Sequence, residues 1–156
     1  MIPPIVRRFV AGETAATALD HARSANADGI GVILNLLGEH HDDPAAADAD
    51  TETYLRLIED VATTDLDVRV SVKPSQLGLD VSQARFAENY RRIVDAGADH
   101  GVFVWCDMED SMTTDATIDA FEAATAGSRS AATTPRWSPG PGGSPTSTAA
   151  TTRSRC

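Results

Sequence analysis

Three short apolar runs alternate with amphipathic segments, and this alternation limits the chain to few folds. The runs are rich in β-branched residues and cover residues 29–37, 68–72 and 101–107. A short run that is apolar on both faces is typical of a central strand in a parallel sheet. Parallel strands need right-handed crossover connections, so the order predicts an α/β fold with helices packed on the sheet.

Four helices are expected around these strands, and they cover residues 14–24, 48–63, 82–96 and 114–126. Thr14 and Ser82 are candidate N-caps because their hydroxyl oxygens can accept a bond from the first helical turn. The second helix can also begin earlier, close to Pro44. Gly97 and Gly127 are the expected helix ends, since glycine readily adopts the left-handed conformation that terminates a helix.

The charge of the chain excludes some classes of partner. The formal net charge is −10, which argues against nucleic acid and against an anionic membrane surface. Acidic excess with almost no lysine is typical of a halophile, whose proteins stay hydrated through carboxylates. A GC-rich genome that favours Arg, Ala, Asp and Gly codons explains the same composition, and both can hold.

The cysteines and the apolar runs indicate a cytoplasmic protein. Cys106 and Cys156 are the two cysteines, too few for a disulfide framework, which favours a reducing compartment. The first ten residues lack the apolar core of a signal peptide. No apolar run approaches the ~20 residues of a transmembrane segment.

The composition changes abruptly at residue 128. Residues 128–156 contain no Asp, Glu, Leu, Ile, Val, Phe, Met or Tyr. Such a segment cannot bury enough apolar surface to offset its chain entropy, so we expect a disordered low-complexity tail after a domain at 1–127. The preferred interpretation is out-of-frame translation of a GC-rich gene, which makes the chain truncated. The alternative is a genuine flexible tail.

Three polar side chains are expected at the carboxyl ends of the strands, where chemistry gathers in parallel α/β folds. They are Asn35, Lys73 and Asp107. Lys73 is the only lysine, and an ammonium at the end of an apolar strand suits an anionic ligand. A solvated lysine is the structural alternative for Lys73, and a capping acid is the alternative for Asp107.

Other chemically interesting residues have structural interpretations. The cluster at 39–43 contains Glu, two His and two Asp, which are metal ligands. Adjacent residues of an extended loop point in different directions, so no metal site is predicted. Cys106 is expected to be a buried small apolar residue. Glu109 and Asp110 are expected to be loop acids in solvent.

Four motifs together resemble proline dehydrogenase, a flavin-dependent enzyme with a (β/α)₈ TIM barrel. They are LNLLGE at 34–39, SVKPSQLGLD at 71–80, DMEDS at 107–111 and the leading RFVAGE at 8–13. The resemblance covers residues 7 to about 126, the N-terminal half of the family domain. It implies a partial barrel that contains the first three β/α units of eight.

The resemblance also implies an activity and roles for residues. The family oxidises L-proline to pyrroline-5-carboxylate by hydride transfer to FAD, and the electrons pass to a quinone or similar acceptor, which can lie at the membrane periphery. Lys73 matches the lysine that pairs with the substrate carboxylate. Asp107 matches the active-site aspartate beneath substrate and flavin. Met108 lies in the motif that contacts the flavin.

Two departures from the family pattern set further expectations. Asn35 stands where family members often carry an aspartate that gates the pocket through an arginine. The later flavin-binding strands and the C-terminal arginine pair have no counterpart, so the chain is expected to bind little FAD and to be inactive. The alternatives are a non-catalytic β/α fragment or interaction module, and another barrel enzyme with an anionic substrate.

Overall fold

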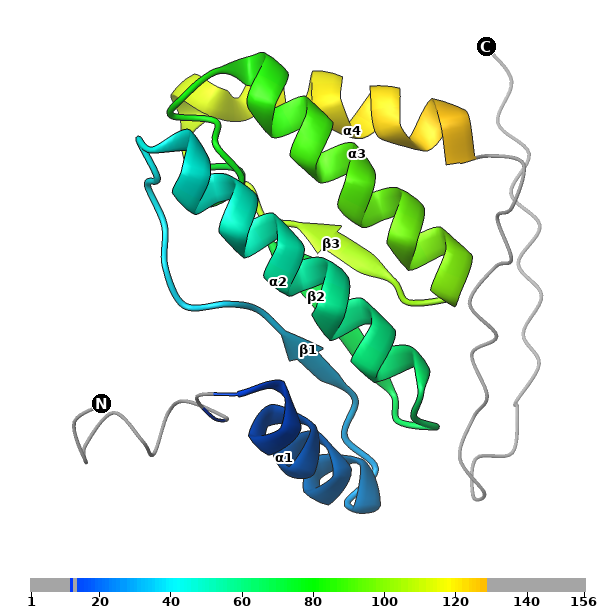
Figure 1. Cartoon of the computed structure of the whole chain (residues 1–156). Helices are drawn as coiled ribbons and strands as arrows, with labels where there is room; N and C mark the ends of the chain where they lie inside the picture. Colours follow the sequence, from blue (N-terminus) through cyan, green and yellow to red (C-terminus); the bar gives the residue numbers. More distant parts are fainter. Residues whose placement is uncertain (1–11, 13, 129–156) are drawn as a thin grey trace, which may run out of the picture.

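The computed structural model describes residue 12 and residues 14–128, and in this part of the chain helices and strands alternate (Figure 1). In chain order the elements are α1 (Ala15–Ala27), β1 (Val32–Leu34), α2 (Pro44–Ala62), β2 (Val68–Val72), α3 (Gln83–His100), β3 (Val104–Cys106), the short 3₁₀ helix η2 (Ser111–Thr113) and α4 (Thr114–Ser128). Residues 129–156 of the predicted disordered tail lie outside the described residues, and Ser128 is the last residue of α4.

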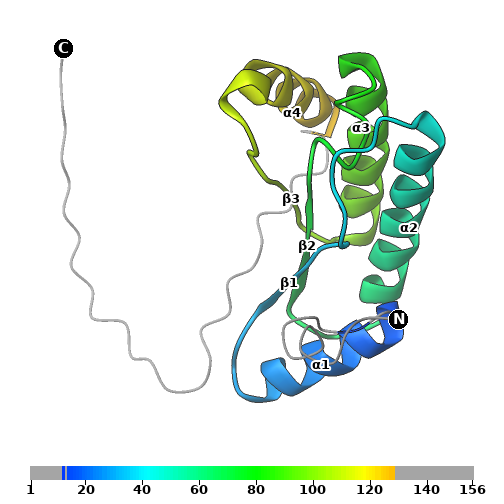
Figure 2. The same cartoon turned by 90° about the vertical axis from the view of Figure 1, so that its left-hand side faces the viewer.

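The three strands form one parallel sheet in the order β1-β2-β3. Val32 pairs with Val68, and Val72 pairs with Cys106. Helices α2 and α3 cross one face of this sheet side by side, and α4 packs against α3 (Figures 1 and 2). The predicted α/β fold with parallel strands is therefore confirmed.

The core lies between the sheet and helices α2 and α3. Val70 and Val72 of β2 are fully buried, as are Ile58 of α2 and Ile93 of α3. The side chains that fill the remaining space are mostly aromatic and come from both helices. They are Tyr54, Phe86 and Tyr90, and the last two rings stack at a centroid separation of 5.7 Å.

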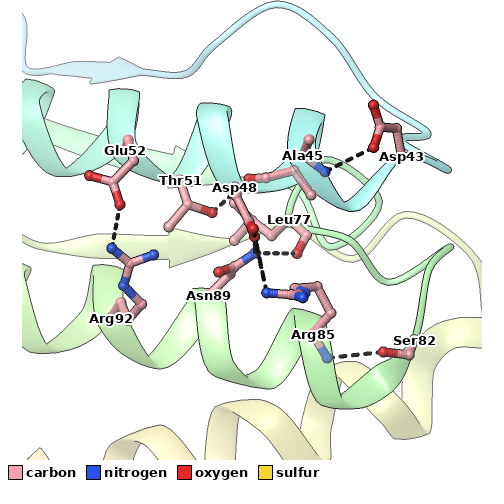
Figure 3. A network of polar contacts seen from close by, with 11 residues as sticks. Asp43, Ala45, Asp48, Thr51, Glu52, Leu77, Ser82, Arg85, Asn89 and Arg92 are labelled. Atoms are coloured by element: carbon pink, nitrogen blue, oxygen red, sulfur yellow. Dashed lines mark hydrogen bonds and ion pairs between the residues drawn. The ribbon is translucent and has the colours of Figure 1, made fainter.

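Polar contacts fix α2 against α3 (Figure 3). The Asn89 amide is 1% exposed and donates to the Leu77 carbonyl and the Asp48 carboxylate, each at 3.2 Å. Arg85 pairs with the same Asp48 carboxylate, and Arg92 pairs with Glu52 of α2. A buried amide that is fully bonded costs little, whereas an unpaired one would destabilise this interface.

Two of the three strands are shorter and less buried than expected. Both β1 and β3 have three residues, and Ile33 and Trp105 are 54% and 46% exposed. Successive side chains of a strand point to opposite faces of the sheet, and α2 and α3 cover only one of these faces (Figure 2). The prediction of burial on both faces is therefore wrong for β1 and β3, while β2 is buried except for Arg69.

The predicted N-caps are confirmed. The Thr14 hydroxyl accepts a bond from the Thr17 backbone N–H, and the Ser82 hydroxyl accepts one from the Arg85 N–H. Helix α2 begins at Pro44, and the Asp43 carboxylate caps it. Proline suits this position because it has no N–H to leave unsatisfied.

The two predicted helix ends are wrong. Helix α3 continues through Gly97 to His100 and ends at Gly101, whose φ of 70° is left-handed. Gly97 is glycine for another reason: a Cβ there would lie 2.8 Å from the Val102 carbonyl oxygen and 2.7 Å from a Val104 methyl. Helix α4 likewise passes through Gly127 to Ser128.

None of the helices in the described part combines the length and apolar character that crossing a bilayer requires.

Gly97→Ala should destabilise the chain because the added methyl overlaps the Val102 carbonyl and the Val104 side chain. The overlap is expected to lower the free energy of unfolding by about 1–3 kcal/mol. This loss is larger than the gain from the higher helix propensity of alanine. The measurement is the free energy of unfolding in urea.

Ala98→Gly at the neighbouring exposed position is the control for propensity, with an expected cost of about 0.5–1 kcal/mol. A Gly97→Ala protein as stable as the original would show that α3 and the start of β3 are not closely packed.

Candidate functional site

The ends of the three strands bring the predicted polar residues to one edge of the sheet. Asn35, Lys73 and Asp107 each follow the last residue of their strand. The Asp107 backbone N–H donates to the Val72 carbonyl at 2.9 Å. Because Lys73 directly follows Val72, Lys73 and Asp107 lie at the ends of neighbouring strands. The structure therefore brings these residues to one edge, as their places in the sequence indicate.

Lys73 forms a close ion pair with Glu39. The ammonium Nζ donates to Glu39 Oε2 at 2.6 Å, and the two side chains are 26% and 54% exposed. This hydrogen bond raises the pKa of Lys73, and the nearby carboxylates of Glu109 and Asp107 add to the effect. The same bond lowers the pKa of Glu39. Both groups are therefore charged at neutral pH.

The loop from β1 to α2 presents Glu39 to Lys73. His40 Nδ1 lies 2.9 Å from an Asp80 oxygen, and His41 Nε2 lies 2.8 Å from an Asp50 oxygen. His40 has a φ of 58°, which is unusual outside glycine. The residues of this loop contact different partners, and in the described part no group of three His, Cys, Asp or Glu side chains could hold a metal ion.

The acidic loop after β3 contacts the turn after β2. Glu109 Oε2 accepts a bond from the Ser75 backbone N–H at 2.9 Å, and Asp110 caps η2 through the Met112 N–H at 2.8 Å. Both acids are exposed, as expected, but each also orders backbone. Glu109 in particular links the turn that carries Lys73 to the loop that carries Asp107.

A buried hydrogen-bond network is centred on Tyr54. The Tyr54 hydroxyl accepts a bond from the Leu36 N–H at 3.1 Å and donates to Gln76 Oε1 at 2.8 Å. Tyr54 is on α2, Leu36 follows β1 and Gln76 follows β2, so one hydroxyl joins three segments. Burial raises the pKa of Tyr54, which keeps this hydroxyl a donor.

One side chain of this network, Gln76, has a buried polar atom without a partner, and two serine hydroxyls on or just after β2 share this property. Among the described residues these atoms are Ser71 Oγ, Ser75 Oγ and Gln76 Nε2. A Cβ on Gly38 would lie 3.4 Å from Gln76 Nε2, so this glycine leaves space beside the amide. Buried donors are normally satisfied, and such an exception indicates a polar site.

Asp107 and Met108 are both exposed at the edge. No described residue is hydrogen-bonded or ion-paired to the Asp107 carboxylate, which leaves it accessible to a ligand. The Met108 side chain is 52% exposed. Cys106 is partly buried, and burial raises its pKa to about 12, so its thiol is not a nucleophile at neutral pH.

Sequence reasoning missed three residues of this site: Glu39, Tyr54 and Gln76. Glu39 lies in the motif LNLLGE and in the cluster at 39–43, and Gln76 lies in the motif SVKPSQLGLD, but neither was given a role in the site. No local pattern indicated that Gln76 is fully buried. The available signals were these motifs and the place of Glu39 and Gln76 just after two parallel strands, where loops converge.

Comparison with known proteins identifies relatives of the chain. The family model described as proline dehydrogenase matches residues 18–135. Proline dehydrogenase of Deinococcus radiodurans is 32% identical over 120 residues, which is 75% of this chain and 39% of the relative. Proline dehydrogenase 2 of Bacillus subtilis (strain 168) is 29% identical over 115 residues, which is 74% of this chain and 38% of the relative.

A solved structure shares the fold. It is that of proline utilization A from Bdellovibrio bacteriovorus inactivated by N-propargylglycine. The TM-score is 0.64 at 22% identity, over 74% of this chain and 14% of that one. The chain thus spans about two fifths of the length of these curated relatives.

Tyr54→Phe should destabilise the chain, because it leaves the Leu36 N–H and Gln76 Oε1 without their buried partner. The expected loss is about 1–3 kcal/mol in the free energy of unfolding. Tyr90→Phe is the control: the Tyr90 side chain is also buried, but its hydroxyl takes no part in the network around Leu36 and Gln76. Equal losses for the two variants would contradict the role of the Tyr54 network.

His40 should titrate above its ordinary pKa of 6.5, mainly because of its hydrogen bond to Asp80. Protonated His40 then stabilises the fold below pH 6.5, and this contribution is lost as the pH rises through the pKa of the folded state. NMR titration of the His40 imidazole measures this pKa.

Asp80→Asn should return the pKa of His40 towards 6.5. The control is Asp42→Asn, which removes an exposed charge from the same loop. A His40 titration that is the same in all three proteins would show that the Asp80 contact is absent in solution.

Proposed function

The chain belongs to the proline dehydrogenase family, whose model matches most of its length, and from this premise we propose that it contributes to the oxidation of L-proline. In this reaction, proline loses a hydride from the carbon next to nitrogen and a proton from the nitrogen. FAD takes up the two electrons, and the product is pyrroline-5-carboxylate. The observation that carries the proposal is the placement of an ammonium and a free carboxylate at adjacent strand ends.

Lys73 is proposed to bind the carboxylate of proline. Its ammonium lies at the end of a buried strand, and its side chain is only 26% exposed. A charge-assisted hydrogen bond is stronger at such a partly dry site than in water. The neighbouring turn is anchored by Glu109, which limits the positions that the lysine can adopt.

Asp107 is proposed to face the ring nitrogen of proline. The nitrogen is a secondary ammonium in free proline, and the carboxylate of Asp107 is exposed beside the Lys73 strand. A cation and an anion on neighbouring strands match the two charges of the amino acid. Removal of the nitrogen proton precedes or accompanies hydride loss, and a carboxylate at this place stabilises the positive charge that develops.

The described residues suit the apolar flavin ring of FAD but not its negatively charged diphosphate. Exposed apolar side chains, Trp105 and Met108 among them, offer a surface for the flavin ring next to Asp107. The same edge carries the carboxylates of Glu39, Asp107 and Glu109, and all three act on the Lys73 ammonium. This edge would repel a diphosphate. When bound, FAD accepts the hydride, and a quinone or similar acceptor is proposed to reoxidise it.

Proline binding tests the role of Lys73. Titration calorimetry of the full chain with L-proline should show weaker binding for Lys73→Met, by roughly tenfold or more, because the charge-assisted bond is lost. Arg92→Met removes one positive charge on α3, away from the site, and should leave the affinity unchanged. Equal affinity in all three proteins would favour another substrate or a non-catalytic role.

The FAD content of the purified chain tests whether the acidic edge disfavours binding of the cofactor. The purified chain should show far less than one FAD per chain by absorbance, and no dye reduction that depends on proline. The physical reason is the repulsion between the acidic edge and the diphosphate of FAD. Stoichiometric flavin absorbance would contradict this expectation and would show that this chain suffices to bind the cofactor.

A further inference from the structure

The proposed substrate-binding lysine already holds a carboxylate of its own chain. Glu39 Oε2 lies 2.6 Å from Lys73 Nζ, which is the geometry that a bound carboxylate ligand would adopt. Lys73 is the only lysine of the chain. The contact therefore occupies the group that the proposed function assigns to substrate.

The surroundings of Lys73 disfavour a further anion. Three carboxylates act on this one ammonium, namely those of Glu39, Glu109 and Asp107. A ligand carboxylate that arrived while Glu39 remained would enter a region of net negative charge. Coulomb repulsion at a partly buried site is weakly screened, so binding is easiest when one of these carboxylates leaves.

Glu39 is the carboxylate best placed to leave. The Glu109 carboxylate is bonded to the Ser75 backbone, and Asp107 is on the neighbouring strand end. Glu39 is 54% exposed, and among the described residues Lys73 is the one to which its carboxylate is hydrogen-bonded. Released Glu39 would be solvated at little cost.

The loop keeps Glu39 near Lys73 after release. Its neighbours His40 and His41 are bonded to Asp80 and Asp50, and the His41 backbone N–H donates to the Ser75 carbonyl at 3.2 Å. These anchors lie directly after Glu39, so the carboxylate remains tethered close to the ammonium. A tethered group competes at a high effective concentration.

We propose that Glu39 is a built-in competitor for Lys73: it occupies the ammonium in the free chain, and a carboxylate ligand binds by displacing it. This inference rests on the proposed function for the identity of the natural ligand, but not for the competition itself. Glu39 would then weaken substrate binding and would favour ligands whose carboxylate displaces it with the help of a second contact, such as an ammonium near Asp107.

The single lysine makes the competition measurable in the full chain. Lysine labelled with ¹³C gives one side-chain Cε signal, that of Lys73, whose shift reports both ionisation and ligand contact. Sodium acetate and L-proline are titrated separately at constant ionic strength. The proteins are the original chain, Glu39→Gln and, as a control for net charge, Glu88→Gln on the exposed side of α3.

Glu39→Gln should bind acetate and proline roughly two- to fivefold more tightly than the original chain, the range expected for loss of a partly exposed ion pair. Glu88→Gln should bind both as the original chain does. Tighter acetate binding without any response to proline would support the competition and would count against proline as the ligand.

Unchanged or weaker acetate binding in Glu39→Gln would overturn the proposal. An equal gain in Glu88→Gln would also overturn it, because net charge alone would then explain the effect.

Discussion

The parallel pairing of β2 with both of its neighbours is the interaction on which the rest of the structure depends. Val68, Val70 and Val72 of this strand are buried against the helices, while its backbone is bonded to β1 and β3. A central strand satisfies its polar backbone only if both neighbours are in register. That register in turn sets where each of the three strands ends.

The ends of the strands determine the chemistry. Because β2 and β3 run in the same direction, Lys73 and Asp107 emerge from adjacent positions of one edge. The loops then tighten this edge: Glu109 bonds the turn after β2, and the Tyr54 hydroxyl connects that turn to α2 and to the end of β1. The result is an ammonium near three carboxylates, one on the loop after β1 and two on the loop after β3.

Several large apolar side chains of the described part are exposed on the sheet and on α4. Ile33 and Trp105 lie on the face of the sheet that α2 and α3 do not cover, and Ile118 and Phe121 of α4 are also exposed. Large apolar side chains at such positions are typical of surfaces that further structure covers. The chain spans about two fifths of the length of its curated relatives.

Local chemistry was readable from the sequence alone. The N-caps Thr14 and Ser82 and the strand at 68–72 depend on a few adjacent residues, and each is confirmed. The family that the motifs indicated is confirmed as well. The roles of individual glycines were less predictable, because glycine is favoured both at a helix end and where a helix lies close to a strand. Gly97 and Gly101 differ only in what lies beside them, which a linear pattern does not contain.

The sequence by itself determined the fold class, the family and the places of Lys73 and Asp107, because these follow from periodicity and from short motifs. Only the tertiary structure decided which strand faces are covered and which groups meet at the edge. The contact of Glu39 with Lys73 joins residues 34 positions apart, and the contact of Tyr54 with Gln76 joins residues 22 apart. Contacts at such separations arise from the packing of helices on a sheet, and no local pattern encodes them.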